Sequence, residues 1–143
     1  MKIKTKKILV PLDGSKNSLR GLDMAIHIAR QSQGTLVALT VKSVPGIYAL
    51  HPLGFLDFGS MKEVKKMLND AKTRAAKKGI QLTTKAIAGD PGYDIARYAN
   101  NPKNRIDMVV IGARGRSSAK EIFLGSVSNY VLHKSKKPVL VVK

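Results

Sequence analysis

Residues 7–15 read KILVPLDGS, an apolar run that ends abruptly at the polar turn Asp13-Gly14-Ser15. A strand with one face in water alternates apolar and polar side chains, whereas this run is apolar from residue 8 to residue 12. A short run of this kind that stops at turn residues is typical of a strand covered on both faces. We therefore predict a buried strand of a parallel sheet here, with a turn directly after it.

The rest of the chain alternates strand and helix patterns. Further strands are predicted at 35–41, 82–87, 107–111 and 138–142, and helices at 19–29, 64–75, about 92–99 and from 126 onward. Strands that alternate with helices pair in parallel through right-handed crossovers. The predicted fold class is therefore α/β, a three-layer α/β/α sandwich with a five-stranded parallel sheet. Partial alternation in 82–87 indicates a strand near an edge of that sheet.

The composition is that of an ordinary globular domain. With 143 residues, 43% of them hydrophobic and 24% charged, the chain is expected to form one domain over residues 1–143. There is no cysteine, which excludes disulfides, a Cys-ligated zinc site and a thiol nucleophile. No apolar run is long enough to span a bilayer and no leader pattern is present, so we expect no membrane insertion and a cytoplasmic location.

The net charge is unusually high, at +17. It is spread along the chain, because residues 1–72 carry 12 basic and 5 acidic groups and residues 73–143 carry 14 and 4. Such a field attracts nucleotides, nucleic acid and acidic lipid alike, and selects none of them. The charge is compatible with a functional polyanion surface and equally with a role in solubility.

The chemistry is expected in the loop that follows the fourth strand. Ligands of open α/β sheets bind beyond the carboxyl ends of the strands, where the loops after the first, second and fourth strands meet. The loop after the fourth strand carries Gly112 and Gly115, and Gly125-Ser126 stand at a helix start. Glycine allows positive φ and close approach of an anion, and a helix N-terminus attracts phosphate.

Cationic side chains in the same loop would add to this attraction. Arg114, Arg116 and Lys120 lie between the glycines. The alternative interpretation is a plain strand-to-helix turn with Ser126 as an ordinary N-cap.

Taken together, the spacing Gly-x2-Gly-x9-Gly-Ser at 112–126 resembles the nucleotide-binding pattern of the universal stress protein family. The opening KILVPLDGS resembles the first strand and turn of that family, Gly89-Asp90-Pro91 resembles its short motif after the third strand, and residues 138–142 resemble its closing strand. These matches run from residue 7 to residue 142 in the family's order.

The resemblance implies the adenine nucleotide alpha hydrolase-like strand order 3-2-1-4-5, ATP binding, and a homodimer formed through the last strand. It implies an adenosine pocket lined by Pro11, Asp13 and Val41. It places around the ribose and phosphates Gly112, Arg114, Gly115, Gly125, Ser126 and Val127. Magnesium or manganese can accompany the triphosphate, because phosphate oxygens are preferred ligands of these ions. The sequence itself offers no dedicated metal cage.

Several of these residues also have plain structural explanations. Asp13 can be a turn former, since Asp-Gly is a common turn pair, and Val41 can be a core residue. Asp90 is expected to cap the short helix, with Pro91 in its first turn. Ser117 and Ser118 are open between phosphate contacts and solvated loop residues. The scattered histidines, His27, His51 and His133, give no metal-ligand spacing.

No catalytic machinery is evident, so we expect ATP binding with at most slow hydrolysis. The Gly-x4-Gly-Lys-Ser/Thr phosphate loop, the paired His-x-x-His signature and the Ser-Gly-Gly-x-Asp-Ser loop of adenylyl-transferring folds are absent. Glu121 is the only carboxylate in the glycine loop. The alternative functions are a slow ATPase and a basic protein with weak, sequence-independent contact with nucleic acid.

Residues 43–60 contain three glycines and two prolines and are not expected to form one long regular element. Aromatic and imidazole side chains follow one another in this segment: Tyr48, His51, Phe55 and Phe58. Long connections of this kind are often lids or binding loops. We expect a flap that folds over the nucleotide or contacts a partner.

Overall fold

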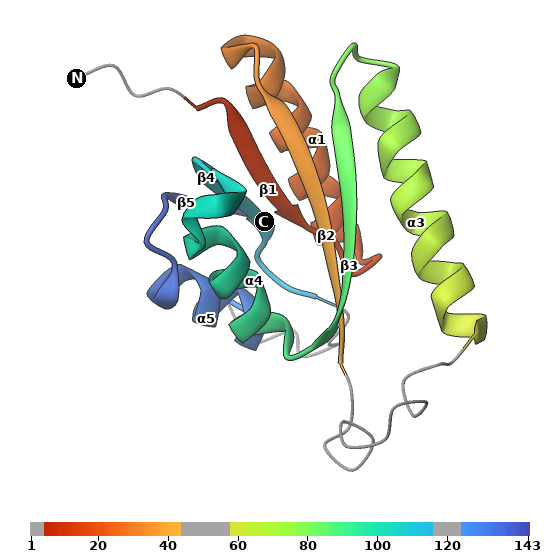
Figure 1. The fold of residues 1–143 in the computed structure, drawn as a ribbon, viewed down its shortest axis with the longest axis vertical. Helices are drawn as coiled ribbons and strands as arrows, with labels where there is room; N and C mark the ends of the chain where they lie inside the picture. The colour runs from red at the N-terminus through yellow and green to blue at the C-terminus, as the bar shows by residue number, and fades with distance from the viewer. Residues whose placement is uncertain (1–4, 44–57, 116–123) are drawn as a thin grey trace.

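Strand β1 (Lys7–Pro11) lies in the middle of a five-stranded sheet with the order β3-β2-β1-β4-β5 (Figure 1). The computed structural model describes residues 5–43, 58–115 and 124–143. The other strands are β2 (Thr35–Ser43), β3 (Leu82–Gly89), β4 (Met108–Gly112) and β5 (Val139–Val142). Every neighbouring pair is parallel. The predicted five-stranded parallel sheet and its order are confirmed.

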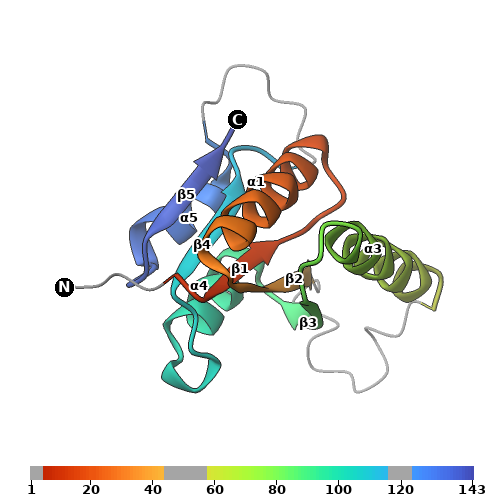
Figure 2. The ribbon, with the colours of Figure 1, turned by 90° about the horizontal axis from the view of Figure 1, so that it is seen from above.

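Helices cover both faces of the sheet, as Figure 2 shows along the strand direction. Helices α1 (Lys16–Ser32) and α3 (Phe58–Ala76) pack on one face, and α4 (Pro91–Asn100) and α5 (Ser126–Lys134) pack on the other. A short 3-10 helix, η1 (Pro102–Asn104), follows α4. The structure is thus the predicted three-layer sandwich.

Burial of β1 on both faces explains why its sequence is apolar throughout. Ile8 and Val10 join the core under α1 and α3, while Leu9 joins the core on the side of α4 and α5. All three side chains have no exposed surface. A polar side chain at any of these three positions would be buried in one of the two cores, so apolar and polar residues cannot alternate along this strand.

The two edges of the sheet differ in how they are covered. In β3 the side chains from Thr83 to Ala86 are exposed, which confirms the prediction that this strand lies at an edge. In β5 all four residues are half-buried, and they face alternately toward the two cores. β5 is therefore an apolar edge strand, the kind that proteins usually cover.

Side-chain caps set where two of the helices begin. Helix α1 starts three residues before its apolar pattern, because the Ser15 hydroxyl accepts a hydrogen bond from the N–H of Ser18 at 3.1 Å. At α4 the predicted cap is confirmed, since Asp90 accepts from the N–H of Tyr93 at 2.9 Å and Pro91 is the first helical residue.

Some predicted boundaries are wrong. Helix α3 begins at Phe58, earlier than its apolar pattern suggested. The fourth strand begins at Met108 and not at Asp107, because the Asp107 side chain turns toward β1. Most of the expected flap, with Tyr48, His51 and Phe55, lies outside the described residues and stays a prediction. Among the described helices, none has the length and apolar character needed to cross a bilayer.

Asp107 ties the start of β1 to the start of β4. One of its carboxylate oxygens, Oδ2, accepts hydrogen bonds from the backbone N–H groups of Lys6 and Lys7, at 2.8 and 2.9 Å. The backbone N–H of Asp107 in turn donates to the carbonyl of Lys7 at 2.9 Å. The carboxylate thus satisfies two N–H groups at the start of β1, those of its first residue and of the residue before it.

We predict that Asp107→Ala lowers the free energy of unfolding by about 1–3 kcal/mol, because two backbone N–H groups, that of Lys7 partly buried and that of Lys6 exposed, lose a charged acceptor. Urea denaturation measures this change. The matched control is Asp70→Ala, which removes a carboxylate from the exposed Lys66–Asp70 pair, whose side chains are 77% and 67% exposed. Because exposed ion pairs add little stability, the control should leave the unfolding midpoint nearly unchanged. Equal effects in both variants would contradict the assignment.

Candidate functional site

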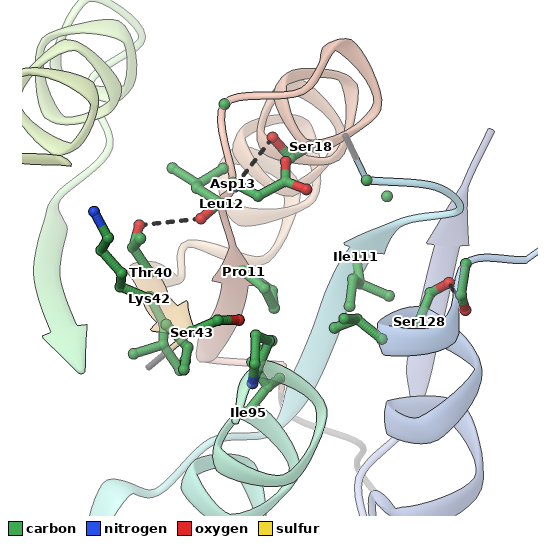
Figure 3. Close-up of a pocket in the computed structure, with 18 of the residues that line it drawn as sticks. Pro11, Leu12, Asp13, Ser18, Thr40, Lys42, Ser43, Ile95, Ile111 and Ser128 are labelled. Atoms are coloured by element: carbon green, nitrogen blue, oxygen red, sulfur yellow. Dashed lines mark hydrogen bonds between the residues drawn. The ribbon is translucent and has the colours of Figure 1, made fainter. Parts of the chain in front are cut away.

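A pocket of about 540 Å³ opens at the carboxyl ends of β1, β2 and β4 (Figure 3). This is the place where the strand order reverses, with β2 on one side of β1 and β4 on the other. Open α/β sheets bind their ligands at such a switch point. Helices α3, α4 and α5 contribute further walls, and Ser18 of α1 also lines the pocket.

The structure brings all the predicted site residues together around this one pocket. The nine that line it are Pro11, Asp13, Val41, Gly112, Arg114, Gly115, Gly125, Ser126 and Val127. They come from four separate parts of the chain, so their convergence results from the topology. Their role as ligand contacts remains a prediction.

One side of the pocket is apolar. Pro11 and Ile111 are buried at the ends of β1 and β4, and Ile95 reaches the pocket from α4 (Figure 3). Val41 and Val127 are half-buried and line the same pocket. Such a surface suits a flat, weakly polar group such as a base or an aromatic ring.

Asp13 shapes the turn after β1 and also presents a carboxylate oxygen to the pocket. Its Oδ1 accepts a hydrogen bond from the N–H of Ser15 at 2.9 Å, and Gly14 between them has φ of +83°. Its Oδ2 lies toward Gly115, 2.6 Å from the point where a Cβ of that residue would stand. The turn-forming and ligand-facing interpretations of Asp13 are therefore compatible.

Gly112 is required by packing. A Cβ at this position would lie 2.7 Å from the carbonyl carbon of Asn17 in the first turn of α1. Gly21 of the same helix lies on the other side of this contact, with its Cβ position 3.4 Å from the N of Gly112. Two glycines thus let α1 approach the end of β4 closely.

Gly112, Gly115 and Gly125 do not use the positive φ that glycine allows. In the part of the chain that the structure describes, the glycines with positive φ are Gly14 and Gly79. Steric room is what matters in the loop: Gly115 leaves space for the Asp13 carboxylate, whereas a Cβ on Gly125 would meet its nearest atom at an ordinary 3.5 Å. Among the described residues, none gives Gly125 a packing reason to be glycine.

The N-terminus of α5 is held against the end of β4 through a single carbonyl. The oxygen of Ala113 accepts hydrogen bonds from the N–H of Gly125 at 2.7 Å and from the hydroxyl of Ser128 at 2.8 Å. The N–H of Ala113 donates to Val142 of β5 at 2.7 Å. Both ends of the glycine loop are thereby fixed to the sheet.

The alternative interpretation, in which Ser126 is the N-cap of this helix, is wrong. The N-cap residue is Gly125, with φ of −68° and ψ of 161°, and it supplies no side-chain cap. Ser126 is the first helical residue and is exposed beside the pocket. The N–H groups of a first helical turn have no acceptor within the helix, so this end of α5 faces the pocket as a partly positive group.

Sequence reasoning missed two residues that position the site. Ser128 is 3% exposed, and its hydroxyl makes the bond to Ala113. Thr40 is 6% exposed, and its hydroxyl donates to the carbonyl of Leu12 at 3.1 Å, which joins the ends of β1 and β2. The available signals were weak: a serine three residues after a helix-start glycine, and a threonine in an otherwise apolar strand.

Other residues singled out from the sequence lie away from the pocket or outside the described residues. His27 and His133 are exposed on α1 and α5 and do not line the pocket. Arg116, Ser117, Ser118, Lys120 and Glu121 lie outside the described residues, as does His51. Of the described charged side chains, those lining the pocket are Lys42, Arg114, Asp13 and Glu63.

The described part of the site contains no metal cage. Among residues 5–43, 58–115 and 124–143, no group of three or more histidine or carboxylate side chains could hold a metal ion. Asp13 and Glu63 are the carboxylates among the described lining residues. A cation here would need most of its oxygen ligands from a bound molecule.

The chain is a doubly wound α/β protein with a ligand-sized pocket at its switch point, the place where proteins of this class bind their ligands. The chain belongs to the universal stress protein family, whose model matches residues 4–143.

Two curated relatives illustrate this membership. Universal stress protein YxiE of Bacillus subtilis is 38% identical over 148 residues, which cover 96% of this chain and 98% of YxiE. Universal stress protein MJ0531 of Methanocaldococcus jannaschii is 33% identical over 141 residues, which cover 96% of this chain and 82% of that protein.

Solved structures agree with the fold. Universal stress protein UspA from Lactobacillus plantarum superposes with a TM-score of 0.87 at 27% identity, covering 99% of this chain and 100% of UspA. A universal stress protein in complex with cAMP gives a TM-score of 0.76 at 27% identity, covering 98% of each chain. The Archaeoglobus fulgidus universal stress protein in complex with dAMP gives 0.72 at 25% identity, covering 99% of this chain and 100% of that one.

We predict that replacing Gly125 by serine leaves the stability of the fold nearly unchanged, whereas replacing Gly112 by serine lowers it. Gly112→Ser should lower the free energy of unfolding by about 1–3 kcal/mol, because the new Cβ meets helix backbone that cannot swing away. Gly125→Ser should change it by less than about 0.5 kcal/mol, since there is room and serine is a good N-cap residue. Denaturant titrations of the two variants give the comparison. A severe loss in Gly125→Ser would show that the space inferred there does not exist.

Proposed function

We propose that this protein binds an adenine nucleotide, ATP, in the pocket at the carboxyl edge. It acts as a nucleotide-binding signalling or stress-response module with at most slow hydrolysis. The observation that carries the proposal is the convergence of all nine predicted residues, including the three spaced glycines, on one pocket of about 540 Å³. We also propose that residues 1–143 form one universal stress protein domain and that it resides in the cytoplasm.

The adenosine end belongs on the apolar side. The side chains of Pro11, Val41, Ile95 and Ile111 offer a surface for the base, and Asp13 stands beside it as a hydrogen-bond acceptor. A carboxylate accepts hydrogen bonds from ribose hydroxyls or from an amino group of the base. A base between apolar side chains with one polar anchor is the usual design of a small-molecule site.

The phosphates belong at the end of α5. There the first-turn N–H groups and the helix dipole favour an anion, and Gly115 and Gly125 leave the backbone uncovered. The exposed Arg114 lines the same part of the pocket and supplies a full positive charge. The carboxylate of Asp13 lies next to Gly115, where a phosphate-bound Mg²⁺ or Mn²⁺ would find an oxygen ligand.

Two family members support an adenine nucleotide as the ligand, because their structures are complexes with cAMP and dAMP. Both ligands share adenine, a sugar and one phosphate group. The extension to a triphosphate rests on the glycine pattern, the helix N-terminus and Arg114. Slow hydrolysis is expected because the described lining residues include no histidine and only two carboxylates, Asp13 and Glu63.

We further propose a homodimer formed through β5. Its four residues are half-buried apolar side chains at a sheet edge, and pairing with a second copy would cover them. The carbonyls of Pro138 and Val142 accept bonds from β4, so the backbone groups of Val139 and Val141 point the other way. These outward groups are available to a second β5 in antiparallel pairing.

We predict that Val141→Pro converts the dimer to a monomer in sedimentation velocity, because it removes an outward N–H while sparing the bonds to β4. Ala86→Pro is the control, because Ala86 lies in β3, the edge strand on the opposite side of the sheet. The carbonyl of Gln81 accepts a hydrogen bond from Leu36 of β2, and since the backbone groups alternate along a strand, the N–H of Ala86 points away from β2. The control should leave the dimer intact. A wild-type monomer, or dissociation of both variants, would contradict pairing through β5.

We predict saturable binding of Mg-ATP in isothermal titration calorimetry, weakened about tenfold or more by Gly115→Ala and by Gly125→Ser, equivalent to about 1.4 kcal/mol. The first variant forces the Asp13 carboxylate aside, and the second places a side chain where phosphate would approach the backbone. Gly79→Asn is the control, because Gly79 lies at the other end of the sheet in open space and asparagine tolerates its φ of +74°. Unchanged affinity in both pocket variants, or no binding by the wild type, would refute the proposal.

A further inference from the structure

The charge is distributed unequally between the two ends of the sheet. We use the term amino edge for three sets of residues: the last turn of each helix, the connection that follows that helix, and the residues at the start of each strand. Its basic residues are Lys6, Lys7, Arg30, Arg74, Lys77, Lys78, Arg97, Lys103, Arg105, Lys134, Lys136 and Lys137, and its one described acid is Asp107. At the other end, the pocket lining is balanced, with two cations and two carboxylates among the described residues.

The topology gathers these cations on one face. All strands run the same way, and each helix returns against them, so every helix ends where the next strand begins. In Figure 1 the starts of β2 and β3 and the ends of α1 and α3 lie at the top, and Figure 2 is viewed onto that end. Basic groups from across the whole chain are therefore neighbours in space.

Most of these cations are not neutralised by the protein itself. Arg74 makes two bonds to Asp23 at 2.7 and 2.8 Å, and Arg97 lies 3.6 Å from Asp94. Asp107 uses its Oδ2 for backbone N–H groups. In the described ranges, the other ten amino-edge cations form no ion pair with a carboxylate. Eight of them are exposed and two, Lys7 and Lys137, are half-buried.

A shallow groove of about 670 Å³ crosses the centre of this edge, at the starts of β1, β2 and β3. Lys6, Lys7 and Arg105 line it, as do Asp107, Leu36 and a set of uncharged donors. These donors are Gln33, Thr35, Gln81 and Thr83. Cations beside amide and hydroxyl donors are the groups that proteins use to contact phosphate oxygens and sugars without reading bases.

We propose that the amino edge binds the phosphate backbone of a nucleic-acid duplex, independently of sequence and on the opposite side from the nucleotide pocket. Four strand spacings make the sheet about 19 Å wide at this edge. Over that length a duplex carries about eleven phosphate charges, at one per roughly 1.7 Å. The ten unpaired cations therefore match an extended polyanion better than a single small anion.

The uncharged side chains of this edge favour a duplex over other polyanions. Single strands are held by stacking on exposed aromatic rings, but the exposed Tyr93 and Tyr130 lie outside the amino edge. Binding at an acidic membrane surface uses several apolar side chains as anchors, whereas Leu132 is the one exposed large hydrophobic residue at this edge in the described chain. The surface is thus cationic and polar.

Stabilisation of helix ends accounts for only part of the pattern. Arg30 and Lys134 lie in last helical turns, where cations interact favourably with the helix dipole. Lys6 contributes in the same way, because its Nζ donates to the carbonyl of Ser32 at the end of α1, at 3.2 Å. Lys103 and Lys136, by contrast, belong to no α-helix. An ordered set of cations beyond the helix ends is what a docking surface requires.

The test compares two variants of equal charge. One is Lys77→Glu, Lys78→Glu, Lys136→Glu and Lys137→Glu at the amino edge. The control is Lys16→Glu, Arg20→Glu, Lys62→Glu and Lys65→Glu, all exposed on α1 and α3 away from that edge and outside the pocket lining. Each substitution changes the charge by two, so four take both proteins from +17 to +9.

Binding is measured by fluorescence anisotropy with a mixed-sequence DNA duplex of about 20 base pairs between about 50 and 200 mM salt. We expect the amino-edge variant to bind about tenfold or more weakly and with a shallower salt slope, by about 0.9 for each phosphate that the variant no longer neutralises. The control should stay within about threefold of the wild type. Equal losses in both variants, or no salt-dependent binding by the wild type, would overturn the proposal.

Three further measurements distinguish this proposal from sequence-specific binding, from binding at the nucleotide pocket and from binding to an acidic membrane. A duplex of scrambled sequence should bind with the same affinity. Saturating Mg-ATP should not displace the duplex from the protein. Competition by ATP would indicate that the duplex binds at the pocket, and this would overturn the proposal. Tighter binding to vesicles containing an acidic phospholipid than to duplex at the same salt would also overturn it. Circular dichroism checks folding, and if charge reversal unfolds the chain, the corresponding Lys→Gln and Arg→Gln variants carry the same comparison.

Discussion

The close contact between the first turn of α1 and the end of β4 sets the position of everything around the pocket. It exists because Gly112 and Gly21 lack side chains at the place where helix and strand meet. With α1 held there, the Asp13 turn that leads into it lies beside the loop that leaves β4, and the carboxylate fits into the space left by Gly115. The Ala113 carbonyl then anchors α5 on the same strand end. One packing contact thus brings a carboxylate, an open backbone and a helix N-terminus together.

Much of this could be predicted from the sequence, because the signals are local. The apolar run before Asp13 indicates a buried parallel strand, and alternation of strands and helices leads to a sheet whose loops meet at one edge. The glycine spacing then points to a loop whose glycines line the pocket. The physical reasons for the glycines could not be predicted, because they depend on residues far away in the chain: Asn17 for Gly112 and Asp13 for Gly115. The same holds for Ser128, whose partner is a carbonyl on another element.

The parallel topology also makes the two ends of the molecule chemically different. Helices begin at the carboxyl edge of the sheet, where their free N–H groups favour anions, and end at the amino edge, where their free carbonyls favour cations. At the carboxyl edge this attraction is combined with a concave pocket and with Asp13 and Glu63, so it suits a compact ligand that is itself part anion and part apolar. At the amino edge the cations outnumber the single acid Asp107 on a shallow surface, which suits a long polyanion.

The distance between the two edges explains why the net charge of +17 does not by itself make a nucleotide site. β1 has five residues, which at about 3.3 Å per residue separates the edges by roughly 16 Å. At physiological salt the Debye length is about 8 Å, so exposed amino-edge cations contribute little to the potential inside the pocket. In the proposed site, the affinity for a phosphate would depend instead on groups within a few ångströms, which are Arg114, the N-terminus of α5 and the uncovered backbone at Gly115 and Gly125. Because both proposed sites would act on their ligands at short range, the two edges can change independently of each other on one sheet.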